Sequence, residues 1–177
     1  MNVSVKAPVP DVLAAEAGQR FRDGMALLAG AVTIVTTDGE NGRHGFTATA
    51  VCSVSDTPPT LLVCINRTTS AHPHVLDHGV LAVNVLGGAQ QTLSSAFGSR
   101  SKTMDERFEG ARWRQGVTGA PLLEGALATF ECRVERVVEA GTHTVVFAQV
   151  LDVHLAGEQT DGLVWFARRY AVVPTSC

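Results

Sequence analysis

Short apolar runs separated by polar turns recur along the chain and predict a mainly β protein. Strands are expected at Ala31–Thr37, Gly45–Ser55, Thr60–Asn66, Val80–Leu86, Ala126–Val138, Thr142–Leu155 and Leu163–Phe166. The run Thr60–Asn66 is almost continuously apolar, which indicates a strand buried on both faces.

Helices are expected at only a few places. Phe21, Met25 and Leu28 recur at helical spacing, and Gly30 can end that helix. Short helices are expected around Pro73 and over residues 88–97, with one helical turn at Asp105–Phe108 inside the long connection 98–121. A parallel sheet would need a helical crossover between most strands. The pattern therefore favours an antiparallel barrel with a few peripheral helices.

The composition fits one soluble domain. The chain has 177 residues, 45% of them apolar, with a net charge of −3. We expect a flexible arm over residues 1–16 and a single domain over 17–173. No concentrated positive surface, bilayer-length apolar run or secretory signal is expected, so nucleic acid and membranes are not expected partners and the cytoplasm is the expected location.

Common catalytic motifs are missing from the sequence. It contains no Rossmann GxGxxG, no phosphate-binding P-loop, no GxSxG elbow and no HExxH helix. The four cysteines form no CxxC pair and are expected to be buried free thiols. His72, His74 and His78 lie close together but lack a completing ligand pattern, so we expect no metal. An enzyme with this sequence is expected to rely on a bound cofactor.

The segment GFTATAVCSVSDTPP is the most informative. If it is one strand, then four hydroxyls share a face: Thr47, Thr49, Ser53 and Ser55. An ordinary half-exposed strand would explain this pattern. A polar, flat ligand lying along the strand would explain it too, and the face carries neither Lys nor Glu.

The motifs GAVTIVTTDG, GFTATAVCSVSDTPPTLLVCINR, VNVL, GTH and VWFARRY make the chain resemble the short-chain flavin reductase family over residues 21–170. CSVSDTPPTLLVC, ARWRQGVTG and GLVWF resemble a subgroup of FMN reductases that serves pyrimidine degradation. The resemblance implies an FMN-binding split barrel, a homodimer, and reduction of FMN (or FAD) by NADH or NADPH. It also implies a flavin-dependent monooxygenase as the partner that receives the reduced flavin.

The resemblance also implies a set of flavin-binding residues. Thr47, Ala48, Thr49 and Ala50 are expected beside the isoalloxazine ring, and Ser53 further along toward the ribityl chain. Asn66, Arg67 and Ser70 are expected near the ribityl and phosphate, and Phe97, Arg168 and Tyr170 near the flavin or the partner subunit. His143 is expected to help place the nicotinamide, in a motif where Thr142 stands in the position usual for Asp.

Taken alone, several of these residues have simpler explanations. Arg67 could be a solvated loop charge, Phe97 a core residue and His143 a turn residue. The expected reaction is hydride transfer from nicotinamide to flavin N5, with no side chain as general acid or base. Two alternatives remain at this point: a non-enzymatic flavin- or heme-binding protein, and a reductase that passes electrons to another acceptor through tightly bound FMN.

Overall fold

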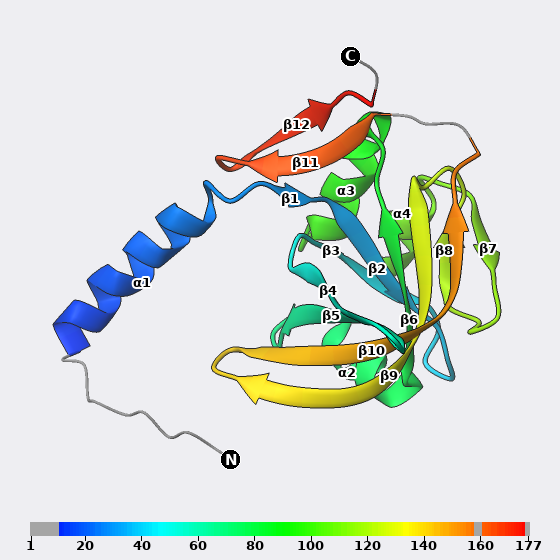
Figure 1. Ribbon diagram of the computed structural model, residues 1–177, viewed down its shortest axis with the longest axis horizontal. Coiled ribbons are helices and arrows are strands. Elements are labelled where there is room, and N and C mark those ends of the chain that lie inside the picture. Colours follow the sequence, from blue (N-terminus) through cyan, green and yellow to red (C-terminus); the bar gives the residue numbers. More distant parts are fainter. Residues whose placement is uncertain (1–10, 158–160, 176–177) are drawn as a thin grey trace.

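The computed structural model describes residues 11–157 and 161–175, and shows an antiparallel barrel flanked by helices (Figure 1). The helices are α1 Asp11–Met25, α2 His72–His78, α3 Gln91–Gly98 and α4 Met104–Phe108, with a short 3-10 turn at Gly88–Gln90. The strands are β1 Gly30–Ala31, β2 Thr33–Thr37, β3 His44–Ala48, β4 Val51–Asp56, β5 Pro59–Asn66, β6 Val80–Val85, β7 Trp113–Gln115, β8 Pro121–Leu123, β9 Ala128–Ala140, β10 His143–Leu155, β11 Gly162–Phe166 and β12 Arg169–Val173. The predicted mainly β, split-barrel fold class is confirmed.

Seven strands form the main sheet, in the order β3-β2-β6-β9-β10-β5-β4. Its two edge strands, β3 and β4, are consecutive in the chain and are joined only by Thr49 and Ala50. So short a link requires the sheet to curl until its edges meet. A hydrogen bond of 3.0 Å from the Cys64 backbone N–H to the Ala50 carbonyl lies at this seam. The barrel therefore closes at the segment that the sequence singled out.

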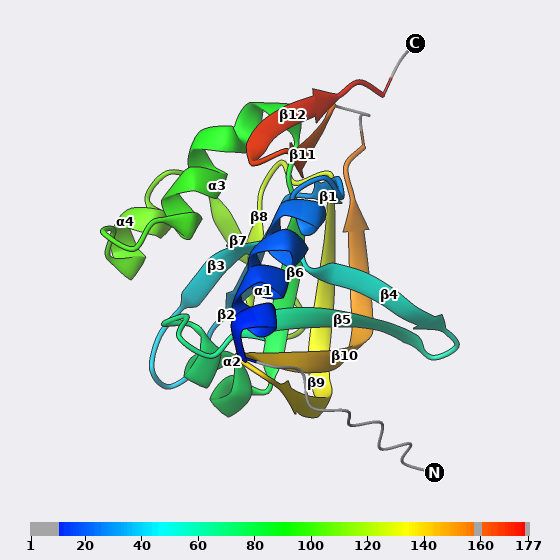
Figure 2. The ribbon, with the colours of Figure 1, turned by 90° about the vertical axis from the view of Figure 1, so that its left-hand side faces the viewer.

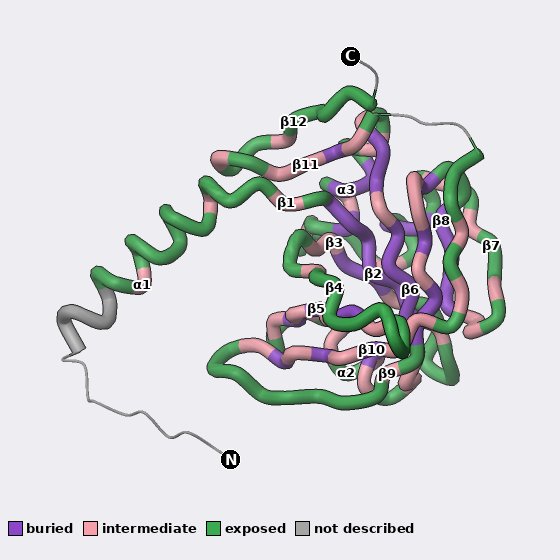
Figure 3. The backbone as a smooth tube through the Cα atoms, in the orientation of Figure 1, coloured by how far each residue is buried: buried purple, intermediate pink, exposed green. Residues whose placement is uncertain are grey.

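The prediction of one continuous strand over Gly45–Ser55 is wrong. The chain leaves the sheet after Ala48, and residues 51–56 pair with β5 on the other side of the seam. β5 also differs from the prediction, because buried and half-buried residues alternate along it instead of both faces being sealed. β2 is buried along its whole length, with the barrel interior on one side and the helical layer on the other (Figure 3).

The described core consists of two large apolar clusters and a small third one around Leu122. One fills the barrel around Val35, Val63 and Val146. The other lies under α3 and α4 and contains Ile34 and Phe97. Because alternate β2 residues point to opposite faces, Val35 enters the first cluster and Ile34 the second. Their burial ties the barrel to the helical layer that borders the site described below (Figure 2).

The helix α1 projects away from the barrel (Figure 1). It begins at Asp11, so its first residues fall within the segment expected to be a flexible arm, whose residues 1–10 lie outside the described part of the chain. Phe21, Leu27 and Leu28 are about two-thirds exposed. Phe21 lies in α1, whereas Leu27 and Leu28 lie in the residues that follow it. So many exposed apolar side chains in one stretch are unusual for an isolated surface and typical of a contact face.

The long connection after α3 contains α4, as predicted, and also a hairpin of β7 and β8 that was not predicted. The strand β12 was missed as well. Of the described cysteines, Cys132 is buried and Cys64 half-buried, but Cys52 is exposed, contrary to expectation. No helix in the described part of the chain is long and apolar enough to cross a membrane.

Candidate functional site

Two adjoining cavities meet at the end of β3. We call the smaller, of about 240 Å³, the aromatic cavity, and the larger, of about 520 Å³, the polar cavity. The aromatic cavity is lined by Val32, Thr47, Ala48, Thr49, Gly98, Trp165 and Tyr170. The polar cavity is lined by Phe46, Thr47, Asn66, Thr68, Thr69, Ser70, Phe97, Gly98, Ser99, Arg100 and Arg107. Thr47 and Gly98 belong to both, so one elongated ligand can occupy the two together.

The aromatic cavity is built around two rings on the β11–β12 hairpin. Trp165 and Tyr170 are cross-strand partners and their ring centroids lie 4.8 Å apart in an edge-to-face arrangement. The Tyr170 hydroxyl is 3.0 Å from Ser94 Oγ, which holds the phenol against α3. These rings face the end of β3. The space suits a flat, conjugated ring system.

Hydrogen bonds fix the β3 wall of this cavity. Thr47 Oγ1 donates to the Ser94 carbonyl at 2.6 Å, and Thr33 Oγ1 donates to the Ala48 carbonyl at 2.8 Å. Thr49 and Ala50 lie outside any strand, so their backbone N–H groups do not belong to a strand ladder. Backbone donors at such a seam can meet the carbonyls and ring nitrogens of a heterocycle.

The polar cavity is rich in donors and positive charge. Its hydroxyl groups come from the loop after β5 and from the end of α3, and Arg100 lies exposed at its border. Asn66 Oδ1 accepts hydrogen bonds of 2.9 Å from both the backbone and the hydroxyl of Thr68, which shapes the loop. Guanidinium and hydroxyl groups together suit a phosphate.

Arg107, which was not identified from the sequence, lines this cavity and connects the backbone segments around it. The residue is 8% exposed, and its guanidinium donates to four backbone carbonyls: Gly45, Phe97, Ser99 and Lys102. Among the described residues no carboxylate forms an ion pair with it. Its positive charge is therefore not neutralised by the protein, and it favours an anion in the adjoining space.

Phe97 forms a wall of the polar cavity and is also a core residue, since it is 1% exposed and packs edge-on against Phe108. Its close approach to β3 depends on Gly45. A Cβ at that position would lie 2.7 Å from the Phe97 ring. Phe97 is therefore a core residue that also lines the polar cavity, and its position near the flavin stays a prediction.

A third, open groove of about 1030 Å³ separates α1 from the barrel. Thr49, Ala50, Trp165 and Arg168 line it together with side chains of α1. Arg168 donates to the Asp23 carboxylate, and this hydrogen bond holds the pKa of Asp23 below its usual value. Thr49, at the seam where β3 ends and the barrel closes, thus lines both the aromatic cavity and the groove.

Nine of the twelve expected site residues border these three spaces. They are Thr47, Ala48, Thr49, Ala50, Asn66, Ser70, Phe97, Arg168 and Tyr170. Ser53, Arg67 and His143 do not line them.

Ser53 was preferred because it shares the strand parity of Thr47, but the break at residues 49–50 removes that relation and leaves it exposed on β4. Arg67 donates to the Gly141 carbonyl at 2.7 Å and to Glu139 at 3.2 Å, so its charge lies at the β9–β10 hairpin. His143 pairs with Asn66 across the β5–β10 ladder, next to the polar cavity. Its Nδ1 is 2.9 Å from Thr142 Oγ1.

The lining of the two cavities contains no Asp, Glu, His or Cys among the described residues. It offers hydroxyls, an amide, aromatic rings and guanidinium groups. Such a set can bind and orient a phosphorylated heterocycle, but it supplies no side-chain nucleophile or acid–base pair. Chemistry at this site has to come from what it binds.

Comparison with known proteins agrees with this arrangement. Residues 25–174 match the family described as the flavin reductase like domain. A curated relative from Stutzerimonas stutzeri strain A1501, "FMN reductase (NADH) RutF", is 55% identical over 150 residues, which is 85% of each chain.

Two solved structures share the fold. BorF, the flavin reductase component of a bacterial two-component tryptophan halogenase, aligns with a TM-score of 0.84 and 32% identity, over 90% of this chain and 99% of that one. The styrene monooxygenase flavin reductase from Pseudomonas putida S12 aligns with a TM-score of 0.78 and 31% identity, over 89% of this chain and 99% of that one.

Proposed function

Because this chain belongs to the flavin reductase like domain family, we propose that it reduces FMN with NADH and releases the reduced flavin to a separate flavin-dependent monooxygenase. It is an oxidoreductase, so the non-enzymatic alternative is set aside. The preference for FMN and NADH rests on the name of the curated relative. The transfer of reduced flavin to a second protein rests on the two solved structures, whose names describe reductase parts of larger systems.

The observation that supports the proposal best is the continuity of the aromatic and polar cavities along the end of β3. FMN is a flat tricyclic ring joined by a ribityl chain to a phosphate. The ring matches the space between Thr47–Thr49 and the Trp165–Tyr170 pair. The phosphate matches the positive end at Arg100 and Arg107. The residues present therefore fit the cofactor in shape and charge.

Bound flavin supplies the hydride acceptor, and the protein supplies position and electrostatics. Backbone N–H groups at Thr49 and Ala50 would donate to the polar edge of the ring and stabilise negative charge there. Trp165 and Tyr170 would flank the ring. Arg100 and the hydroxyl of Ser70, which line the polar cavity, would hold the phosphate by charge-assisted hydrogen bonds.

His143 is next to Asn66 in the β5–β10 ladder, and Asn66 lines the polar cavity. We propose that NADH approaches the flavin from this side and that His143 helps to place the nicotinamide, which leaves the groove beside α1 free for a second copy of the chain. Holding two rings about 3–3.5 Å apart accounts for most of the expected acceleration.

A homodimer is the proposed assembly. Phe21 in α1 and Leu28 just after it are 67% and 65% exposed, and both line the groove beside the seam. A second copy packed there would bury them and would complete the wall of the site. Light scattering tests this assembly: a dimer is expected for the purified protein and a shift toward monomer for Leu28→Asp.

The cytoplasm is the proposed location, since NADH and the monooxygenase are expected there. The resemblance to the pyrimidine-degradation subgroup makes a monooxygenase of that pathway the proposed partner. Co-purification of the two proteins is not required, because reduced flavin can diffuse between them.

The decisive experiment mixes the purified protein, FMN and NADH without oxygen and follows the absorbance of oxidised flavin. We expect this absorbance to disappear at a rate proportional to the protein concentration. Persistence of the absorbance would overturn the proposal. Slow bleaching of a fraction equal to the protein, with no turnover of excess FMN, would favour a prosthetic flavin that serves another acceptor.

A cavity-filling variant links the reaction to this site. Gly98 borders both cavities, and a Cβ there would meet Thr47 at 3.9 Å, so Gly98→Leu leaves the backbone intact and occupies the space. We expect it to weaken FMN binding at least tenfold. The control is Gly157→Leu, because a Cβ at Gly157 meets nothing within 4 Å.

A further inference from the structure

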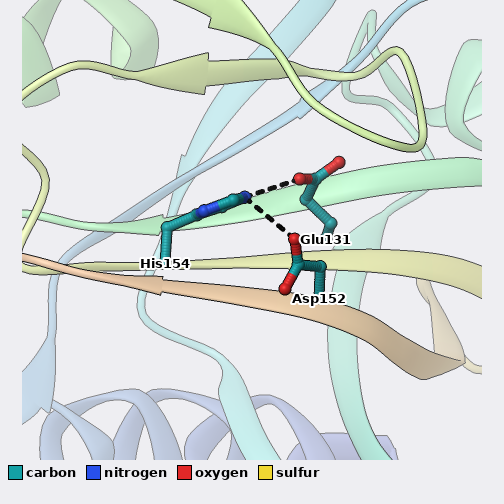
Figure 4. Close-up of side chains that lie close together, drawn as sticks. All are labelled: Glu131, Asp152 and His154. Carbon is teal, nitrogen blue, oxygen red and sulfur yellow. Dashed lines mark hydrogen bonds and ion pairs between the residues drawn. The ribbon is translucent and has the colours of Figure 1, made fainter.

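A buried carboxylate, an imidazole and a second carboxylate converge on β9 and β10, at a place distinct from the cavities described above (Figure 4). His154 Nε2 lies 2.7 Å from Glu131 Oε1 and 3.5 Å from Asp152 Oδ2. One ligand atom from each of the three residues lies within 4.8 Å of the other two. None of the three lines the aromatic or polar cavity.

The sheet itself brings these groups together. Glu131 and Asp152 are direct partners in the β9–β10 register, and His154 is two residues beyond Asp152 on the same strand face. A β-bulge between Val150 and Asp152 sets this register. The positions are therefore fixed by backbone pairing and not by a loose loop, as a pre-formed binding site requires.

The outer contacts of Glu131 hold its carboxylate in one orientation. The side chain is fully buried, and its Oε2 accepts 3.0 Å hydrogen bonds from both the backbone N–H and the hydroxyl of Thr118. Gly116 packs so closely that a Cβ there would lie 2.0 Å from Oε1. Oε1 therefore faces His154. In metal sites, hydrogen-bonding neighbours of a ligand orient it in the same way.

Two carboxyl groups and one imidazole share this place, and the Glu131 side chain is fully buried. A buried carboxyl group needs a charged or hydrogen-bonding partner. A divalent cation between the three side chains would be such a partner for both carboxyl groups.

We propose that Glu131 Oε1, Asp152 Oδ2 and His154 Nε2 bind a divalent transition-metal ion of the zinc class. Metal–ligand bonds of about 2.0–2.2 Å place neighbouring ligand atoms roughly 3–3.5 Å apart. The two separations from Nε2 bracket this range, so small side-chain rotations suffice. One nitrogen and two oxygens form a borderline donor set that suits Zn²⁺ better than Ca²⁺ or Mg²⁺.

The site is open to solvent on one side, so an ion and the water molecules that complete its coordination can enter. The side chains of Asp152 and His154 are 45% and 32% exposed, whereas that of Glu131 is sealed. The ion would fasten β9 and β10 to the segment carrying Gly116 and Thr118. Its role is structural, and the inference stands whether or not the proposed flavin reaction is correct.

The histidine-rich face of α2 does not offer an equivalent site. The rings of His44 and His74 are stacked, with centroids 3.4 Å apart and planes within 9°. Parallel rings at that distance leave no room for an ion between them. This cluster nevertheless provides the control for the experiment, since free imidazoles bind zinc on their own.

The test titrates ZnCl₂ into the full-length, chelator-treated protein by calorimetry. We expect one equivalent to bind, with a rise in melting temperature. The affinity should fall at least tenfold in His154→Gln and in Asp152→Asn. His74→Gln and Glu135→Gln, which change an imidazole and a β9 carboxylate elsewhere, should bind zinc as the wild type does.

Three results would overturn the inference. They are failure to bind an equivalent of zinc in excess ZnCl₂, unchanged affinity in His154→Gln, and loss of binding in His74→Gln alone. Because Asp152 and His154 are partly exposed, their variants are expected to fold. Glu131→Gln, which alters a buried contact, is not needed for the decision.

Discussion

Removal of the Arg107 guanidinium should be among the most damaging single changes outside the barrel interior. The side chain joins four carbonyls from the start of β3, the end of α3 and the following loop. Arg107→Met keeps much of the aliphatic volume and removes every one of these donors. It therefore isolates the polar contribution from the packing contribution.

The expected cost follows from the bond geometry. The bond to the Ser99 carbonyl is short, at 2.6 Å, and the other three are 3.3 Å long and correspondingly weak. A well-formed bond from a charged donor contributes about 1.5–3 kcal/mol, and each of the long ones is assigned about 0.5 kcal/mol, the low end for a protein hydrogen bond. Removing the charge also relieves its desolvation, which offsets part of the loss. We expect a net loss of about 3 kcal/mol in the free energy of unfolding.

Urea unfolding followed by circular dichroism measures this loss, with Arg112→Met as the matched control. The Arg112 side chain is 88% exposed and forms a single surface ion pair with Glu124. Its removal should cost less than about 0.5 kcal/mol. FMN affinity should fall in Arg107→Met and stay unchanged in Arg112→Met. A loss below about 1 kcal/mol for Arg107→Met would refute the assignment of Arg107 as the organiser of the polar cavity.

Other consequences are testable at single residues. Arg100→Gln should weaken FMN roughly tenfold and leave riboflavin unaffected, because riboflavin lacks the phosphate; equal effects on both in fluorescence titrations would contradict the placement. His143→Ala should raise the KM for NADH in steady-state assays without changing the FMN dissociation constant, and the reverse pattern would contradict its proposed role. Burial, followed by repulsion from His74, lowers the pKa of His44 below 6.5, so the folded state loses stability as the pH falls through and below that value. In His44→Gln the melting temperature should fall less as the pH is lowered, and an unchanged pH dependence would exclude His44 as its source.

The fold class could be predicted from the sequence because the turns are short and the helices few. Strand patterning does not encode where a strand leaves its sheet. The segment around Thr47 to Ser53 alternates like one strand, but the curl of the seven-stranded sheet breaks it at residues 49–50. Every inference from a shared face across that break, including the role of Ser53, fails for this reason.

The charge that serves the polar cavity could not be assigned from the sequence either. Arg67 follows a strand and is surrounded by hydroxyls, which made it the natural phosphate ligand. The structure directs it to Glu139 and Gly141 and brings Arg100 and Arg107 to the cavity instead. Arg100 lies in the loop after α3, and Arg107 lies in α4, whose five residues are too few for a periodicity that indicates which way a side chain points.

Glu131, Asp152 and His154 illustrate the same limit. They are spread over two long strands, and their spacing matches no short metal motif. Only the β9–β10 register, with its bulge before Asp152, brings them together.

The most direct test of the account is a crystal structure of the protein soaked with FMN. The account predicts the isoalloxazine ring against Thr47–Ala50, beside Trp165 and Tyr170, with the phosphate at Arg100 and Ser70. Flavin bound elsewhere, with the end of β3 empty, would contradict it.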